Sequence, residues 1–478
     1  MEQMKERKHN RYVLILVAFI CILSACDKQL DLAPEDTTVE TEVFQSESSA
    51  ESALMDVYNK TYEANNSTAY TFGDFTTDLL VTTNSYFNLI NSGDIPTDDT
   101  YFVAGTWENT YAAINVANVI IESAPKLGTY REEAIKQHVA EAKFLRAYNY
   151  LVLQKLYGDG ALTGKMSGLG LPLQLEPYEG TKYNAANALT RSTIQETYNQ
   201  IIKDLTEALP DLLEAYEDDL ETRARATKGS VHALLSRVYL YMGDYDQAAS
   251  EAAFLIGNGN YHLNSDLKAV FPTSSGYDVS LDREYIYAIP LTYNNGDHQF
   301  GTHFYSYYHK SSQYVADDFI SKYTDTDQRK TKLLWKAYTE GYNPSKLTTA
   351  KFNNSDGRDN IPMIRLSEMY LTRAEALAHT SGVNQESVDL LNAIASRADD
   401  GFTNYITSDF TNANDLIDRI LLERELELCF EGLHRYDLIR TGRKLKYKEL
   451  PENKYVLPIP KSEIEITKGS LVQNPGYL

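Results

Sequence analysis

The sequence predicts a mostly α-helical single domain in which tetratricopeptide-like helix pairs support a loop-rich face. Several long segments carry apolar residues three and four residues apart, which is the spacing of one helix face. One of these segments continues into a second helix with the residue pattern of a tetratricopeptide repeat. Two irregular segments, near residues 63–105 and 257–362, are rich in aromatic residues and separate the helical regions. A chain of 478 residues can bury a large core.

Residues 1–25 are predicted to be a lipoprotein signal peptide. Basic residues precede an apolar run over residues 12–22, which is short for a membrane span. Small residues at positions 24 and 25 then precede Cys26, as in a bacterial lipobox. Acylation of Cys26 would anchor the chain stably, because each buried methylene contributes about 0.8 kcal/mol. The alternative is a signal peptide that is cleaved elsewhere, with Cys26 incidental.

Residues 26–45 are polar and acidic and contain Pro34, so we expect a lipidated tether and lead-in rather than a packed element. Without residues 1–25 the chain has 41 Lys and Arg against 65 Asp and Glu, a net charge of −24. This charge argues against nucleic acid as a partner. Only Cys429 would remain beside Cys26, so no intrachain disulfide is expected. No further run of eighteen apolar residues follows, so the lipid is the one membrane attachment that the sequence predicts.

The domain is predicted over residues 46–478 and begins with a helix over residues 46–62, where Ala50, Leu54 and Val57 keep helical spacing. Residues 63–105 lack a clear period and mix aromatic residues with Asn, Ser, Thr and Gly. We expect a long ordered loop here, because the aromatic content argues against disorder. Loops of such length inside compact domains are usually functional.

An antiparallel helix pair is predicted from Trp107 to Gly158, with its turn at Leu127-Gly128. The first helix carries Trp107 at the start of its apolar stripe, and the second continues such a stripe to Leu156. The position of Trp107 in this stripe favours core packing over ligand contact. Residues 158–190 are rich in Gly and polar residues and form a connection.

A third helix pair is predicted over residues 193–213 and 228–242, followed directly by the tetratricopeptide-like pattern. That pattern consists of Leu235, Tyr239, Gly243, Tyr245 and Ala248. The position that is usually Gly in its first helix is Ser236 here. A further pair is predicted over residues 365–378 and 385–398. Fewer than three clean repeats would not stand alone as a solenoid, so we expect one domain.

Residues 257–362 form the second irregular segment, interrupted by many Gly and Pro residues. Within it, residues 293–309 place several tyrosine and phenylalanine rings beside Asn and Gln side chains. This mixture is typical of a recognition loop, although the tyrosines could also be the buried face of a strand.

Five groups of residues give the chain its resemblance to a known family, and one of them is a long and specific Glu-Arg to Asp-Leu-Ile-Arg run. They are Cys26-Asp27 with Leu30-Asp31, residues 107–118, residues 141–159, residues 365–376, and residues 423–440 followed by Pro458-Ile459-Pro460 and residues 474–477. Over nearly the whole chain after the signal peptide, this pattern resembles the SusD/RagB family of outer-membrane lipoproteins.

The resemblance implies a helical fold whose four tetratricopeptide-like helix pairs support a loop-rich ligand-binding face. It also implies lipid anchoring in the outer membrane, facing the cell exterior. The implied partner is a SusC-like TonB-dependent transporter, and the implied ligand is an oligosaccharide or, in some members, a peptide. Capture would be non-catalytic and would need no cofactor.

The charged residues of the Glu-Arg to Asp-Leu-Ile-Arg run lie three and four residues apart. We expect them to be structural, as exposed ion pairs along a helix and its exit that contribute about 0.3–0.5 kcal/mol each. Ligand binding is instead expected in the two irregular segments, where flat rings could stack on sugars and amides could bond hydroxyl groups. The candidate ligand-binding residues are Tyr86, Phe87, Tyr101, Tyr293, Asn294, Asn295, Tyr305 and Tyr307.

No motif in the sequence points to an enzyme or to a bound metal. With 65 acidic residues, some pair will always match the carboxylate spacing of a glycoside hydrolase. His303 and His309 do not have zinc spacing, and the calcium-loop pattern near 353–359 fails because Phe352 stands in the first ligand position. Besides non-catalytic capture, two functions stay open: a lipid-anchored surface glycoside hydrolase, and a tetratricopeptide scaffold that binds peptide or protein.

Overall fold

The computed structural model describes residues 40–65, 72–82, 85–178, 189–271, 281–290, 313–336, 346–354, 359–445 and 450–477. Helices dominate these residues, and the strands form only short two-stranded antiparallel sheets. The prediction of a mostly helical single domain is confirmed. Cys26 and the predicted signal peptide and tether up to residue 39 lie outside the described residues.

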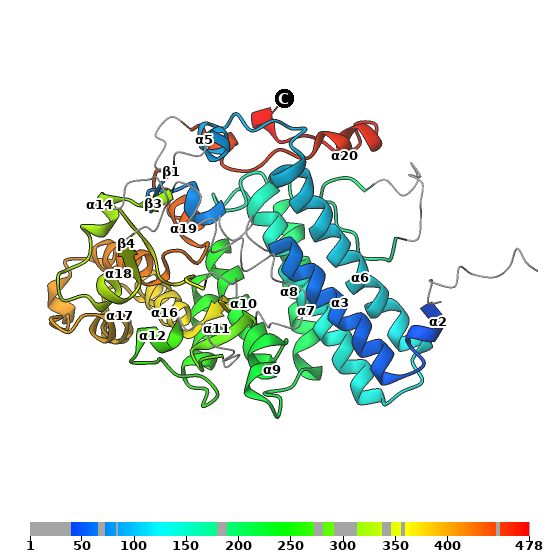
Figure 1. The fold of residues 1–478 in the computed structure, drawn as a ribbon, viewed down its shortest axis with the longest axis horizontal. Helices are drawn as coiled ribbons and strands as arrows, with labels where there is room; N and C mark the ends of the chain where they lie inside the picture. The colour runs from blue at the N-terminus through cyan, green and yellow to red at the C-terminus, as the bar shows by residue number, and fades with distance from the viewer. Residues whose placement is uncertain are drawn as a thin grey trace, which may run out of the picture.

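One side of the molecule is a layer of long helices around α7, at the right of Figure 1. It consists of α3 (Glu47–Asn65), α6 (Thr106–Leu127), α7 (Glu132–Tyr157) and α8 (Ile194–Ala208). Helices α3, α6 and α8 all pack against α7. The predicted first helix and the predicted pair from Trp107 to Gly158 are confirmed, and the chain turns at Gly128, whose N–H donates to Ala124 O at 3.0 Å.

The tetratricopeptide-like unit is formed by α10 (Lys228–Met242) and α11 (Tyr245–Ile256). Gly243 ends α10 with a φ of 76°, a conformation that glycine adopts without a steric penalty. Ser236, which replaces the usual glycine, is buried, and its hydroxyl donates to Ala248 O at 2.9 Å. The close approach of the two helices is therefore kept by a hydrogen bond across the pair.

On the other side of the molecule, further helices pack beside the pair of α10 and α11 (Figure 1). They are α16 (Leu366–Ser381), α17 (Gln385–Ala398) and α18 (Ala413–Leu428). Helix α16 packs against α11, α17 and α18. The predicted pair over 365–378 and 385–398 is confirmed as α16 and α17. The predicted helices over 193–213 and 228–242 are confirmed as α8 and α10, which contact each other, although α8 packs chiefly on α7 and α10 packs chiefly on α11.

The two irregular segments contain short regular elements in their described parts, so the expectation of one long loop over 63–105 is wrong. The first segment contains β1 (Leu80–Thr82), α5 (Ser85–Ser92) and the π-helix η1 (Thr100–Gly105). The second contains α12 (Leu267–Val270), β2 (Tyr285–Ile289), β3 (Gln313–Val315), α14 (Asp317–Ile320), α15 (Gln328–Lys332), β4 (Leu334–Lys336), β5 (Leu347–Thr349) and the start of β6 (Ile361–Arg365).

The remaining described elements are short. They are α2 (Glu40–Val43), η3 (Leu209–Asp211), α9 (Asp219–Ala224), η6 (Thr407–Asp409), α19 (His434–Arg440), η7 (Glu452–Lys454), α20 (Lys461–Ile466) and η8 (Pro475–Tyr477). The C-terminal segment returns to the end of α7, where Asn474 Nδ2 donates to Tyr157 O at 3.0 Å and to Leu457 O at 2.7 Å. In Figure 1 it lies beside α5 and α20.

Candidate ligand-binding site

The pairing of β1 with β3 joins the two irregular segments. The strands are antiparallel, with Leu80 opposite Val315 and Thr82 opposite Gln313. Beyond the strand ends, Ala316 N–H donates to Leu79 O at 2.9 Å. The chain just before Tyr86 and the chain just after the aromatic stretch 293–309 are therefore held side by side (Figure 1).

Tyr101 is a described candidate whose ring reaches solvent, with half of its surface exposed. It lies in η1, and its ring packs edge-on against Phe102 with the centroids 5.1 Å apart. The backbone beneath it is well ordered, because Asp99 Oδ1 accepts from Tyr101 N at 3.2 Å, from Phe102 N at 2.7 Å and from Val103 N at 3.0 Å. A capped turn that leads directly into α6 thus presents the ring.

The buried residues of η1 hold this turn against the end of α7. The Tyr157 hydroxyl, at the end of α7, donates to Val103 O at 2.8 Å. The π-helix η1 is not among the elements predicted from the sequence. The available signal was Asp99, because Asp at the start of a helical turn caps the first backbone N–H groups.

Phe87 belongs to the core, which corrects its place among the ligand-binding candidates. Its ring is 1% exposed and lies 4.8 Å from the ring of Phe75 and 5.7 Å from that of Phe102. It is one of the apolar residues of α5 that face inward. An aromatic residue in an irregular sequence was therefore not enough to indicate an exposed ring.

The other candidates stay predictions. Tyr86 lies in α5, but its side chain is outside the described residues. The candidates of the second segment also lie outside the described residues: Tyr293, Asn294, Asn295, Tyr305 and Tyr307. The expectation for Trp107 is confirmed, because its ring is buried and packs against Tyr111 at 4.8 Å and Tyr157 at 5.1 Å.

The charged residues of α18 and the turn after it form a buried network, not a series of exposed pairs. Glu423 accepts from Arg329 Nη1 at 2.6 Å, Glu427 from Arg365 Nη1 at 2.7 Å, and Glu431 from Arg365 Nε at 2.7 Å. We call this group the motif network: Glu284, Arg329, Lys351, Arg365, Arg397, Glu423, Glu427 and Glu431. Its members come from elements far apart in the sequence.

The expectation of exposed ion pairs along one helix is therefore wrong. The expectation that these residues are structural is consistent with their burial. Burial alone would raise the pKa of Glu427, but the Arg397 and Arg365 guanidinium groups hold that pKa well below its usual range. Removing one partner of such a buried pair typically costs about 3–5 kcal/mol, because the other charge is left buried and uncompensated.

A second charged cluster joins the first irregular segment to α19. His434 Nε2 lies 2.9 Å from Asp78 Oδ1, and Glu425 lies within reach of both side chains. These three groups have the types and spacing of metal ligands, but the Lys322 ammonium group lies beside them, in contact with Glu425 and 3.6 Å from Asp78. We therefore interpret the cluster as a set of ion pairs that holds residues 72–82 against α18 and α19.

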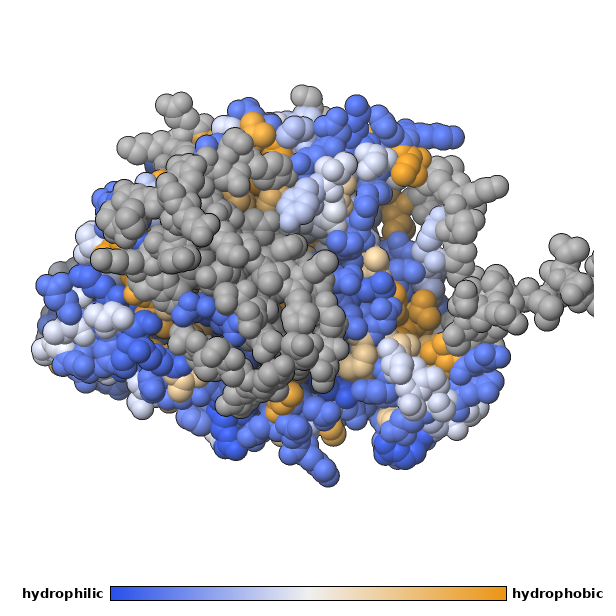
Figure 2. All heavy atoms as spheres, in the orientation of Figure 1, coloured by the Kyte–Doolittle hydropathy of each residue, from blue (hydrophilic) through white to orange (hydrophobic). Residues whose placement is uncertain are grey.

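The surface drawn in Figure 2 is mostly hydrophilic over the described residues, with hydrophobic residues in scattered patches. Within the described part of the chain, no helix has both the length and the apolar character needed to cross a membrane.

Comparison with known proteins identifies similar chains across almost the whole sequence. Residues 28–240 match a family model described as "Starch-binding associating with outer membrane", and residues 239–454 match a model described as "SusD family". "SusD-like protein P38" of Formosa agariphila is 24% identical over 494 residues, covering 93% of each chain.

Solved structures of similar fold also cover most of the chain. A SusD superfamily protein from Bacteroides thetaiotaomicron superposes with a TM-score of 0.76 at 24% identity, covering 90% of this chain and all of the other. A protein described as "Laminarin binding SusD-like protein" superposes with a TM-score of 0.72 at 23% identity, covering 91% of this chain and all of the other. At these identities the likeness establishes the shared helical fold.

Proposed function

Because the chain belongs to the SusD/RagB family, we propose that it captures a glycan at the cell surface without cleaving it and delivers it to a SusC-like TonB-dependent transporter. The family is one of carbohydrate-binding proteins associated with the outer membrane. For this chain, the proposed ligand is an oligosaccharide, and the proposed anchor is a lipid on Cys26.

The observation that carries the proposal is the β1–β3 pairing, which joins the flanks of the two aromatic segments. Tyr86 follows Thr82 by four residues, and Tyr307 precedes Gln313 by six. Tyr101 is held on a capped turn of the first segment with half of its surface exposed. The proposed binding face therefore combines Tyr86 and Tyr101 with Tyr293, Asn294, Asn295, Tyr305 and Tyr307.

The chemistry of these residues suits sugars. The flat face of a tyrosine ring packs against the C–H face of a pyranose, while its hydroxyl stays free to meet water or a sugar oxygen. Each asparagine amide offers two donors and an acceptor for neighbouring hydroxyl groups. Stacking and hydrogen bonding of this kind bind a sugar without providing the acid and base that hydrolysis would need.

Affinity electrophoresis with a turnover assay tests this function. The purified protein is run through gels that contain laminarin, starch or xylan, and the same mixtures are analysed for released sugars. We expect retardation by at least one polysaccharide and no product. Tyr305→Ala with Tyr307→Ala should abolish the retardation, while Tyr178→Ala, which removes a ring that is 44% exposed outside both segments, should leave it unchanged. Released product would contradict capture and support a hydrolase.

A further inference from the structure

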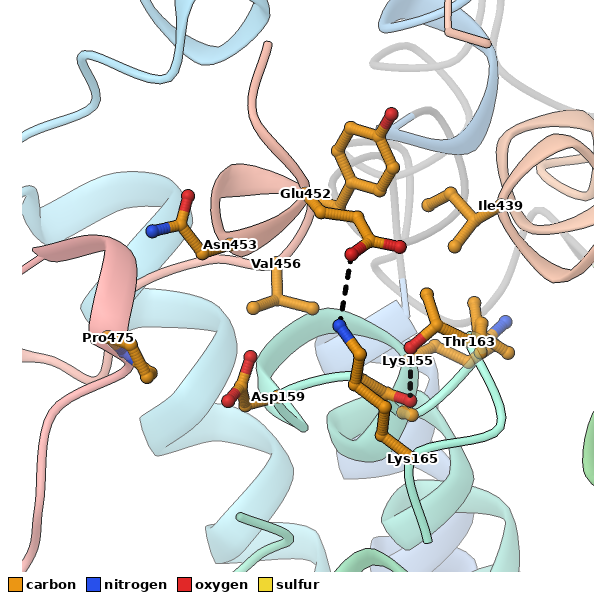
Figure 3. Close-up of a pocket in the computed structure, with 13 residues that line it drawn as sticks. Lys155, Asp159, Thr163, Lys165, Ile439, Glu452, Asn453, Val456 and Pro475 are labelled. Atoms are coloured by element: carbon orange, nitrogen blue, oxygen red, sulfur yellow. Dashed lines mark hydrogen bonds and ion pairs between the residues drawn. The ribbon is translucent and has the colours of Figure 1, made fainter. Parts of the chain in front are cut away.

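A pocket of about 330 Å³ lies between the C-terminal end of α7 and the turn at η7, outside both aromatic segments. Its polar lining includes Lys155, Asp159, Lys165, Glu452 and Asn453, and Tyr455 adds an aromatic wall (Figure 3). This volume lies at the lower end of the range of small-molecule sites in proteins. The pocket is therefore large enough for a small ligand such as a single sugar.

Lys155 is the unusual residue in this pocket, and Lys351 shows why. Lys155 is half-buried, whereas Lys351 is fully buried, and Lys351 Nζ donates to Glu427 O at 2.8 Å and Cys429 O at 2.9 Å and pairs with Glu431 at 2.5 Å. These three acceptors use all three donors of the ammonium group. Among the described residues, no carboxylate pairs with Lys155, whose ammonium group lies 4.4 Å from the centroid of the Tyr436 ring.

A half-buried ammonium group without a carboxylate in direct contact is energetically unfavourable. Burial, assisted by the nearby Arg237 cation, lowers the pKa of Lys155 to about 7, although Glu368 and Asp437 act in the opposite direction. An anion that entered the pocket and approached Lys155 would supply the missing counter-charge. It would also raise the pKa of Lys155, so that binding would take up a proton near neutral pH.

The other polar groups of the pocket are suited to hydroxyl groups. Within the described chain, neither the Asp159 carboxylate nor the Asn453 amide has a side-chain hydrogen bond to another residue, so both are available to a ligand. Lys165 and Glu452 form an ion pair of 3.0 Å across the pocket, drawn as a dashed line in Figure 3. Both side chains of this pair are more than half exposed, so it contributes little stability and can yield to a ligand.

We propose that this pocket binds a sugar acid, with the ligand carboxylate paired to Lys155 and its hydroxyl groups bonded to Asp159 and Asn453. The pocket is distinct from the face proposed for glycan capture, because none of its lining residues belongs to the two aromatic segments. The two proposals can therefore fail independently of each other.

Isothermal titration calorimetry with D-glucuronate and its uncharged analogue D-glucuronamide tests the proposal. Glucuronate should bind at least tenfold more tightly than glucuronamide at pH 7.5. Titration in two buffers of different ionisation enthalpy should show uptake of roughly half a proton or more with glucuronate and none with glucuronamide. The affinity for glucuronate should fall as the pH rises from 7 to 9. Equal affinity for the two probes, or no binding of either, would overturn the proposal.

Variants of Lys155 separate binding from folding. Lys155→Gln should weaken glucuronate binding at least tenfold, and Lys155→Arg, which keeps the charge, should retain most of it. Lys126→Gln, which changes an exposed lysine of α6 paired with Glu122, is the matched control and should have no effect. If Lys155→Gln fails to fold, the proton uptake of the unaltered protein still decides the question. Unchanged binding in a folded Lys155→Gln protein would overturn the proposal.

Discussion

The motif network and the proposed glycan-binding face use polar and aromatic residues for opposite purposes. In the network, Arg365 is buried and donates to three carboxylates contributed by two separate parts of the chain. At the face, Tyr101 keeps half of its surface exposed to water while Asp99 fixes the backbone beneath it. The comparison teaches that burial and partners, rather than residue type, distinguish a stabilising residue from one available to a ligand.

The largest expected effect lies in the motif network. Glu427→Gln removes the charge that Arg365, Arg397 and Arg329 share, so three buried cations lose a counter-charge. We expect the free energy of unfolding to fall by about 3–5 kcal/mol, measured from urea denaturation. Glu122→Gln, at an exposed pair, should change it by less than about 0.5 kcal/mol. Equal losses of stability in the two variants would contradict the claim that buried charge pairs stabilise the fold more than exposed ones.

Phe87 and Tyr101 allow a buried ring and an exposed ring to be compared within the first irregular segment. Phe87→Ala leaves a cavity beside Phe75 and Phe102 and should cost about 3–5 kcal/mol of stability. Tyr101→Ala removes an exposed ring and should cost less than about 1 kcal/mol. Thermal and urea denaturation of both variants check this order. A large loss of stability in Tyr101→Ala would place that ring in the core.

A backbone contact links the first segment to the loop after the network. A Cβ added at Gly73 would lie 2.3 Å from Gly432 O, so Gly73→Ala forces the two backbones apart. We expect a loss of about 1–3 kcal/mol in the free energy of unfolding. Gly259→Ala is the matched control, because a Cβ there meets open space. An unchanged free energy of unfolding in Gly73→Ala would show that the backbone at Gly73 can move away from Gly432 without cost.

The smallest expected effect concerns pH. Burial opposes protonation of His434, but its hydrogen bond with Asp78 leaves the pKa of His434 above its ordinary value. The same contact leaves the pKa of Asp78 below its ordinary value, against the effect of burial. The pair therefore stabilises the fold between about pH 4 and pH 6.5. This stabilisation is lost as the pH rises through the pKa of folded His434, or falls through that of folded Asp78.

His434→Gln should remove this pH dependence. Because Asp78 is partly exposed, we expect the pair to contribute about 1 kcal/mol or less. Urea midpoints at pH 5.5 and pH 8 should differ less in the variant than in the unaltered protein. An unchanged difference would show that other groups cause the pH dependence.

The sequence predicted the long helices well because their signals are local. Apolar spacing and terminal residues define α16, α17 and the turn at Gly128. The three-residue strands β1 and β3 were missed, because residues that are more than 200 positions apart decide their pairing. Spacing along α18 also could not reveal its burial, since Arg329, Lys351 and Arg365 come from other segments.

The candidate site was predictable only in outline. The aromatic content of residues 63–105 and 257–362 indicated the segments, and Tyr101 is exposed as expected. The same content could not distinguish Phe87, because an inward position on the short helix α5 decides its burial. The pocket at Lys155 had no sequence signal, since its walls come from the end of α7 and from the C-terminal turns.

The central claim is that the two aromatic segments bind one glycan together, and the affinities of two single variants test it most directly. The dissociation constant for the polysaccharide that retards the protein is measured for Tyr101→Ala, from the first segment, and for Tyr305→Ala, from the second. We predict that each variant binds at least tenfold more weakly, with Tyr178→Ala unchanged. Unaltered affinity in either variant would contradict a shared binding face.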